Sequence, residues 1–233
     1  MFDELAERLR AVPTATAKQL LREMGVDRTV MKGLRAMTSG RRVAGTARTL
    51  HYLPYREDAA PPQTGLNRHL IDSIGSGEIV VIDAGGNDEG AVLGDMLAAR
   101  AQSCGAAGVV ADGVIRDVDG IRDLGLAVWA KGTHPDSNVR ALLAWEIDVA
   151  VQCGGVLVLP GDYVLADSDA AMVVPPHLAE AMIGKAEEMA IEDEFSQELL
   201  RHGSGLNEAY PIPSARREEY ERFARPKRRH AGS

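Results

Sequence analysis

The middle of the chain most constrains its fold, because it combines two apolar runs, a glycine-rich turn and a helical pattern. Residues 78–83 (EIVVID) are mostly apolar and predict a buried strand. Residues 84–90 (AGGNDEG) form a turn, and apolar residues at helical spacing predict a helix over about 92–104. A second strand is predicted over 108–111, closed by a turn at Asp112-Gly113. This unit predicts the α/β class.

After this unit the pattern becomes rich in strands and ends in a long helix. A first helix is expected over 14–24, capped by Thr14 or Thr16, and the long one over 177–201. Strands and helices no longer alternate after residue 130, which argues against a full Rossmann domain, and we expect a mixed sheet or two packed sheets. The other predicted elements are strands at 42–53, 126–130, 147–151, 155–159, 163–165 and 171–174, and a brief helix at 67–74.

Composition and charge limit the classes of partner. The chain has 233 residues, of which 45% are hydrophobic, which is enough for one full core. Its 26 Lys and Arg against 34 Asp and Glu give a net charge of −8, which argues against a general nucleic-acid binder. Residues 214–233 nevertheless hold seven basic and three acidic residues, a net of +4. We expect this tail to be a solvated, frayed terminus, with contact to RNA or an acidic partner as the alternative.

The sequence also indicates a compartment. Cys104 and Cys153 are far apart and neither belongs to a CxxC pair, which favours buried thiols in a reducing environment. The first ten residues are charged and lack the apolar stretch of a signal peptide. No apolar run approaches the roughly 18 residues that a membrane span needs. We therefore expect a cytoplasmic protein without membrane contact.

Most catalytic and cofactor motifs are absent, which leaves one combination of acids and an arginine. The glycine-rich turn lacks the GxGxxG spacing, and there is no P-loop, no GxSxG and no metal-type Cys/His spacing. Asp95 begins the predicted central helix, and Arg116 and Asp117 follow the second strand. Carboxylates suit Mg²⁺ or Mn²⁺, and a guanidinium suits a substrate carboxylate. Both residues can serve one site if the chain turns at Asp112-Gly113; otherwise they form an ordinary surface pair.

The same central run resembles the RraA-like family. This family includes the class II 4-hydroxy-4-methyl-2-oxoglutarate aldolases, which also decarboxylate oxaloacetate, and the RNase E regulator RraA. The resemblance covers roughly residues 15–205. The similar positions are Gly94-Asp95, Ala101, Gly105, Gly108, Asp112-Gly113 and Arg116-Asp117, with the segments 42–47, 80–86, 153–162 and 173–175.

The resemblance implies a fold and an assembly. The family's fold is a three-layer ββα sandwich related to swivelling phosphohistidine domains, here with a C-terminal helix. Members form homotrimers or homohexamers, with active sites between subunits. We therefore expect one RraA-like domain over 1–205, followed by a C-terminal extension with a basic tail over 206–233.

The resemblance also assigns roles to matching residues. Asp117 would ligate the divalent metal, Arg116 would bind the keto-acid end of the substrate, and Asp95 would hold a metal-bound or catalytic water. Gly94 and the main-chain amides near Met96 and Leu97 would bind the substrate carboxylate.

An acid from a neighbouring subunit is expected to complete the water shell of the metal. We favour Glu194, then Glu192, with Asp193 as the third acidic residue of the same segment. The alternative is that these acids simply form the solvated face of a helix.

Together these expectations predict a Mg²⁺- or Mn²⁺-dependent carbon–carbon lyase. It would cleave 4-hydroxy-4-methyl-2-oxoglutarate-type substrates to pyruvate and decarboxylate oxaloacetate through an enolate. The family's RNase E regulators lack the Asp that follows the Arg, so the pair Arg116-Asp117 favours an enzyme. One alternative is an RNase E-type regulator without turnover, and another is a lyase or hydratase acting on sugar-derived acids. We expect a small 2-oxo acid as ligand and no nucleic-acid or RNase contact.

Overall fold

The computed structural model describes residues 3–38 and 41–231. Its contacts divide the chain into two compact units, Met1–Glu180 and Ala181–Ser233. The division falls within helix α6 (Pro176–Arg201). The expected domain boundary at 205 follows the extent of the family resemblance rather than compactness, and it stays a prediction.

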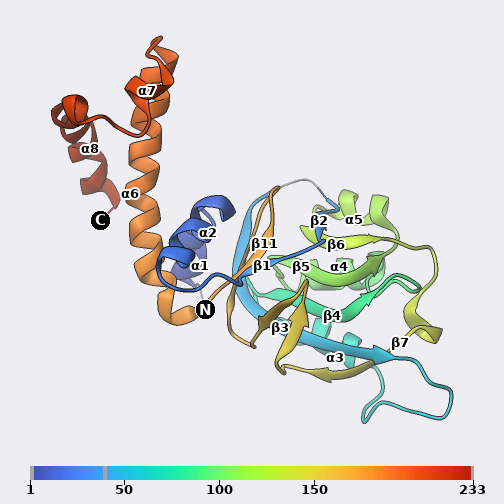
Figure 1. Ribbon diagram of the computed structural model, residues 1–233. Helices are drawn as coiled ribbons and strands as arrows, with labels where there is room; N and C mark the ends of the chain where they lie inside the picture. Colours follow the sequence, from blue (N-terminus) through green and yellow to red (C-terminus); the bar gives the residue numbers. More distant parts are fainter. Residues whose placement is uncertain (1–2, 39–40, 232–233) are drawn as a thin grey trace. The chain divides into compact units, whose positions relative to one another are not determined.

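The first unit is built on a nine-stranded sheet in the described part of the chain (Figure 1). Its centre is the parallel run β3–β4–β5–β6, so the carboxyl ends of these strands meet at one edge. Antiparallel strands extend the sheet in the order β1-β11-β10-β3-β4-β5-β6-β2, with β7 also paired to β3. The strands are β1 (Val30–Met31), β2 (Arg35–Ala36), β3 (Val43–Pro54), β4 (Ile79–Asn87), β5 (Gly108–Ile115), β6 (Val128–Thr133), β7 (Leu142–Ile147), β10 (Tyr163–Ala166) and β11 (Ala171–Val174).

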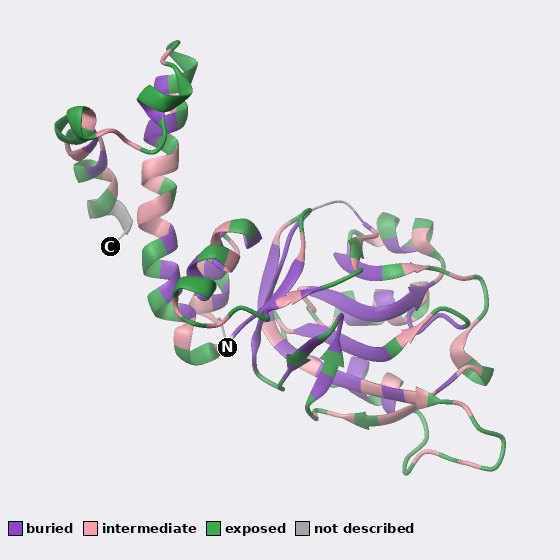
Figure 2. Ribbon diagram, viewed as in Figure 1, coloured by how far each residue is buried: buried purple, intermediate pink, exposed green. Residues whose placement is uncertain are grey.

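Alternate residues of the central strands feed two separate cores. Val80 and Ile82 of β4 pack with the helices α3 (Leu66–Asp72), α4 (Asp95–Ser103) and α5 (Val118–Leu124). The intervening residues pack on the other face against the hairpin β8–β9 (Val151–Cys153 and Val156–Val158) and against β10 and β11. Figure 2 shows the central strands largely buried. The arrangement is helices, sheet and β-hairpin, which confirms the predicted three-layer α/β fold.

The remaining helices of this unit are α1 (Glu4–Leu9), α2 (Thr14–Glu23) and the single turn η1 (Asn138–Arg140). Helix α2 confirms the prediction over 14–24, but its predicted cap is wrong because Pro13 holds the N-cap position. The N–H and Oγ1 of Thr14 instead donate to Asp167, at 2.9 and 2.7 Å. Asp167 lies 153 residues along the chain, so no local pattern could indicate this contact.

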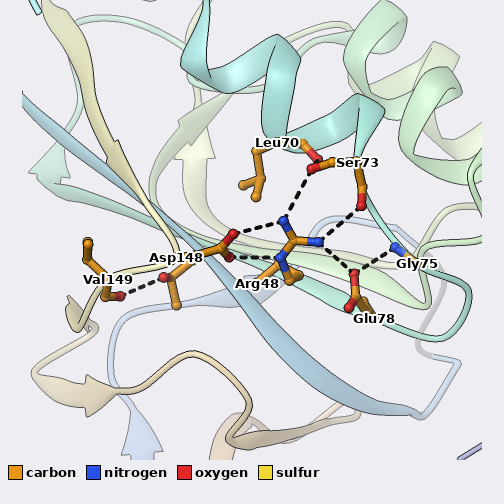
Figure 3. Close-up of polar contacts among 8 residues, drawn as sticks. Arg48, Leu70, Ser73, Gly75, Glu78, Asp148 and Val149 are labelled. Atoms are coloured by element: carbon orange, nitrogen blue, oxygen red, sulfur yellow. Dashed lines mark hydrogen bonds and ion pairs between the residues drawn. The ribbon is translucent and has the colours of Figure 1, made fainter. Parts of the chain in front are cut away.

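Arg48 of β3 joins three segments near the amino end of the parallel strands (Figure 3). Its guanidinium donates to both carboxylate oxygens of Asp148 at 2.8 and 2.9 Å, to Glu78 at 3.2 Å and to the carbonyl of Ser73 at 3.1 Å. The hydrogen bonds to Asp148 are the main reason why the pKa of Arg48 is raised. Glu78 in turn accepts the N–H of Gly75, so the network fixes the turn before β4.

The strand predicted over 147–151 is wrong in its position. Asp148 has a left-handed backbone (φ 53°), so β7 ends at Ile147 and β8 begins only at Val151. The bidentate contact with Arg48 holds this turn. The other predicted strands lie within a few residues of those observed.

The second unit is helical and contains the rest of α6, α7 (Leu206–Ala209), the turn η2 (Ser214–Arg216) and α8 (Arg217–Ala231). The rings of Phe195 and Tyr220 pack edge to face with centroids 5.7 Å apart. Arg228 donates to Glu188 and lowers the pKa of that carboxyl below its ordinary value. The prediction that the tail frays is therefore wrong for residues 214–231, because Tyr220 and Ala224 are fully buried in a folded helix pair; residues 232–233 lie outside the described part of the chain.

Across both units, none of the helices among the described residues has the length and apolar character that crossing a membrane requires.

Candidate active site

The end of β5 turns later than the sequence suggests. The strand continues through Asp112-Gly113 with a register shift to Ile115, so the predicted turn at this dipeptide is wrong. Asp112 is 2% exposed, and its carboxylate accepts the N–H of Gly154 at 3.0 Å from the β8–β9 hairpin. The dipeptide Asp112-Gly113 usually marks a turn, but here the buried hydrogen bond from Gly154 holds it in a strand.

The turn that shapes the site is at Asp117. Its backbone is left-handed (φ 57°, ψ 37°), and it precedes α5 directly. Because both residues follow the end of the strand, the side chains of Arg116 and Asp117 do not point to opposite faces as they would within a strand. Arg116 Nε lies 3.2 Å from Asp117 Oδ2, and both side chains are about two-fifths exposed. A non-glycine residue in this conformation costs about 1 kcal/mol or more, and such strain concentrates at functional sites.

The start of α4 is tied to the end of β5 by main-chain hydrogen bonds. Val92 N–H donates to the carbonyl of Val114 at 3.0 Å, and Arg116 N–H donates to that of Leu93 at 2.9 Å. These bonds bring Gly94, the N-cap of α4, beside the arginine. A β-carbon on Gly94 would lie 2.9 Å from Asp117 Oδ2 and 3.1 Å from Arg116 Nε. The missing side chain is therefore what lets the acid and the arginine approach α4.

Asp95, the first residue of α4, has a similar neighbour. A β-carbon on Gly120 of α5 would lie 3.4 Å from Asp95 Cβ and 3.7 Å from its Oδ2. Each of the two carboxylates thus lies against a glycine of the other helix: Asp117 against Gly94, and Asp95 against Gly120. Sequence reasoning missed Gly120, and the available signal was only a glycine three residues after Asp117.

The amides predicted to bind the substrate carboxylate lie in the first turn of α4, whose N–H groups have no partner within the helix. The N–H of Met96 already donates to Asp95 Oδ1 at 2.8 Å, so substrate would have to displace this contact. Met96 exposes its side chain, whereas Leu97 packs on the core beneath α4. The structure brings together Gly94, Asp95, Met96, Leu97, Arg116 and Asp117.

The three acids predicted to act from a neighbouring subunit lie on α6 in the second unit. Glu194 Oε1 lies 2.8 Å from Lys227 Nζ of α8, and Glu192 lies 3.8 Å from Arg217. Asp193 is half-buried. Their predicted role stays a prediction, and any such role would require Glu194 to leave Lys227.

The donors around Asp117 fit a hard cation that keeps most of its water. Nowhere in residues 3–38 and 41–231 do three or more His, Cys, Asp or Glu side chains form a possible metal cage. Asp117 instead offers a partly exposed carboxylate next to Gly94, which contributes no side chain to cover it. One or two protein carboxylates with several waters is the arrangement that Mg²⁺ prefers.

A polar cluster with buried carboxylates lies on the hairpin face of β4, β5 and β6. Lys131 Nζ lies 2.8 Å from Asp112 Oδ1, and a β-carbon on Gly86 would lie 2.6 Å from the same nitrogen. Asp83, 7% exposed, accepts the N–H groups of Gly85 and Gln152, both at 3.0 Å. These carboxylates hold the β8–β9 hairpin against the irregular strand ends, and sequence reasoning did not identify them.

Comparison with known proteins gives a consistent family match. Residues 6–173 match the RraA-like family, described as Aldolase/RraA. A protein of Hahella chejuensis is 40% identical over 112 residues, which cover 48% of this chain and 68% of that protein. One of Pseudomonas aeruginosa is 40% identical over 113 residues, covering 48% of this chain and 69% of its own. Both carry the name "Putative 4-hydroxy-4-methyl-2-oxoglutarate aldolase".

Solved structures agree with this match. Streptomyces coelicolor RraAS2, described as an unusual member of the RNase ES inhibitor RraA protein family, is 39% identical with a TM-score of 0.78. The alignment covers 84% of this chain and 97% of that one. A Pseudomonas syringae protein at 24% identity and a TM-score of 0.79, covering 90% and 98% of the two chains, supports the fold.

Proposed function

The chain belongs to the RraA-like family, and from that premise we propose that it is a carbon–carbon lyase that acts on 2-oxo acids with Mg²⁺ or Mn²⁺. The observation that carries the proposal is the corner where Asp117 and Arg116 lie against Gly94. It combines a carboxylate for a hard cation with a guanidinium for an anionic oxygen. The aldolase names of relatives at 40% identity point to the same chemistry.

Asp117 would hold the cation directly, with water in the other positions. When bound, a divalent cation supplies Lewis-acid polarisation of the substrate's 2-oxo group. Arg116 binds the oxygen on which negative charge develops as the bond to C3 breaks, and stabilises that charge by hydrogen bonding. The first-turn amides of α4 orient the substrate carboxylate.

Aldol cleavage also needs a base for the proton of the 4-hydroxyl group. Asp95 is the candidate, acting through one water, because it is half-buried at the start of α4 beside the Arg116-Asp117 corner. Decarboxylation of oxaloacetate loses CO₂ without that proton transfer. It therefore depends on Arg116 and Asp117 but much less on Asp95.

We further propose that the protein works as a homotrimer or homohexamer in which Glu194 of one subunit reaches the site of the next. Glu192 and Asp193 are the other candidates. The ion pair between Glu194 and Lys227 is exposed, and such pairs contribute only about 0–1 kcal/mol, so exchanging it is feasible. Light scattering and a Glu194→Gln variant test this part.

The experiment that tests the proposal is a coupled pyruvate-release assay with the full chain. We expect 4-hydroxy-4-methyl-2-oxoglutarate and oxaloacetate to release pyruvate with Mg²⁺, and EDTA to abolish the release. Asp117→Ala should be inactive with both, whereas Asp58→Ala, in an exposed loop pair with Arg56, serves as the matched control. Full activity of Asp117→Ala would refute the assignment.

A second candidate is a regulator that binds an RNase without turnover. The observation in its favour is the 39% identity to RraAS2 of the RNase ES inhibitor RraA protein family. The retained Asp117 argues against it, because a binding protein has no need of the metal ligand. Capture of an RNase by the full chain, without metal-dependent pyruvate release, would favour this candidate.

A further inference from the structure

A second polar pocket lies in the loops that follow the carboxyl ends of β4 and β6. It has a volume of about 400 Å³, and none of the residues of the candidate active site lines it. One wall comes from the turn after β4 and the other from the segment around η1. Its lining residues are Glu89, Asp136, Ser137, Val139, Arg140 and Ala141.

Main-chain bonds connect this pocket to the candidate active site. Ala91 N–H donates to the carbonyl of Asp136 at 2.9 Å, and Ala91 pairs with Ser137 in a parallel bridge. Two residues further on, Leu93 accepts the N–H of Arg116. The segment 91–93 therefore runs between the pocket wall and the arginine. Ser137 and Arg116 are separated by two residues along this segment and by two strand-to-strand spacings across it. The Cα atoms of Ser137 and Arg116 therefore lie roughly 12 Å apart.

A bound 2-oxo acid must extend its distal end away from Arg116, and the pocket is a place for that end. Its charged side chains are available to a ligand: in the described part of the chain, Glu89, Asp136 and Arg140 are exposed and no hydrogen bond or ion pair involves their side chains. The lining therefore holds two carboxylates and one guanidinium. A distal carboxylate would meet net negative charge here.

An uncharged, hydroxylated tail fits the same groups better. Each hydroxyl donates to a carboxylate oxygen of Glu89 or Asp136 and accepts from Arg140 or from the hydroxyl of Ser137. Hydrogen bonds to charged groups are stronger than those between neutral groups. The lining therefore discriminates between a hydroxylated tail and a carboxylated one.

We propose that this pocket binds the distal end of the substrate, and that the substrate is a sugar-derived 4-hydroxy-2-oxo acid with further hydroxyls beyond C4. This inference rests on the proposed lyase function. In the reaction the 4-hydroxyl group loses its proton, the C3–C4 bond breaks, and its electrons move to C3, which takes up a proton. The products are pyruvate and a hydroxyaldehyde, and no oxidant, reductant or co-reactant is needed.

The test compares two probes in the pyruvate-release assay with the full chain and Mg²⁺. The hydroxylated probe is 2-dehydro-3-deoxygluconate, and the dicarboxylate is 4-hydroxy-4-methyl-2-oxoglutarate. We expect the wild type to have the higher kcat/KM with the hydroxylated probe. Asp136→Asn should lower that value about tenfold, mainly through KM, and should leave or raise the value for the dicarboxylate. Arg140→Met should also lower kcat/KM for the hydroxylated probe.

Two controls separate binding from folding and from the general reaction. Asp58→Asn removes an exposed carboxylate outside the pocket and should leave the ratio of the two kcat/KM values unchanged. Thermal melting should show that Asp136→Asn and Arg140→Met fold as the wild type does. If the wild type prefers the dicarboxylate and neither pocket variant changes the ratio, the inference fails while the lyase proposal stands. If no 2-oxo acid releases pyruvate, both fail.

Discussion

Gly94 and Asp117 lie so close together that a β-carbon on the glycine would be 2.9 Å from the carboxylate oxygen Oδ2. Because the backbone of Gly94 is extended (φ −131°, ψ 178°), alanine there creates no backbone strain. Gly94→Ala should therefore act by displacing the Asp117 carboxylate and the Arg116 side chain, whose Nε would lie 3.1 Å from the new β-carbon. We expect its kcat/KM for pyruvate release to fall by at least about tenfold, since small misplacements of a catalytic group are costly.

Mn²⁺ affinity provides the second readout for Gly94→Ala and should weaken together with kcat/KM. The matched control is Gly184→Ala, because the β-carbon at Gly184 would enter open space on helix α6. It should keep full activity and gain about 0.5–1 kcal/mol of stability from the better helix former. Unchanged Mn²⁺ binding in Gly94→Ala would contradict the role of this contact.

Substitutions at Gly120 should affect the two reactions of the proposed enzyme differently. Gly120→Ala places its β-carbon 3.4 Å from Asp95 Cβ, an ordinary contact, so this variant should remain active. Gly120→Val adds two methyl groups that crowd Asp95. We expect the valine variant to lose most aldol cleavage but to retain most oxaloacetate decarboxylation, because only the first reaction uses Asp95 as a base. The two kcat values measure this, and an equal loss in both would contradict it.

Local patterns were sufficient to predict most of the fold. The apolar run of β4 and the helical spacing of α4 depend on neighbours in sequence, and both elements were predicted within a few residues. The turn at Asp112-Gly113 was not, because the carboxylate of Asp112 is bound by Gly154, forty-two residues away. The α6–α8 pair was missed because the contact between Phe195 and Tyr220 is likewise tertiary.

The candidate site divides in the same way. Asp95, Arg116 and Asp117 were identified from a motif that is continuous in sequence. Gly120 and Lys131 have meaning only through the side chains against which they pack, so the sequence alone did not single them out. The roles of Gly120 and Lys131 follow from contacts between helices and strands, not from their residue types.

Lys131 should matter for stability because it is the counter-charge of a buried acid. Lys131→Met leaves the carboxylate of Asp112, 2% exposed, with only its hydrogen bonds to Gly154 and Gln152. We expect a loss of about 2–4 kcal/mol in the free energy of unfolding, measured with urea. Adding Asp112→Asn should recover part of the loss.

The comparison for Lys131→Met is Arg56→Met, which breaks the exposed pair with Asp58. Exposed pairs contribute about 0–1 kcal/mol, so this variant should be close to wild type. Equal effects of the two substitutions would mean that the carboxylate of Asp112 tolerates the loss of its cation.

Asp167 should make the first unit sensitive to acid. Burial tends to raise the pKa of its carboxyl, but hydrogen bonds from the N–H and Oγ1 of Thr14, together with those from the N–H groups of Asp169 and Ala170, outweigh it, and the pKa lies below its ordinary value. A carboxyl whose pKa is depressed by folding stabilises the folded state above the unfolded pKa of about 3.9, and this contribution disappears as the pH falls through the folded pKa. Asp167→Asn should therefore cost about 1–2 kcal/mol at pH 7 and clearly less at pH 3. Urea unfolding followed by tryptophan fluorescence measures both values, because one of the two tryptophans, Trp129, donates through Nε1 to the carbonyl of Asp167. Equal losses at the two pH values would contradict the assignment.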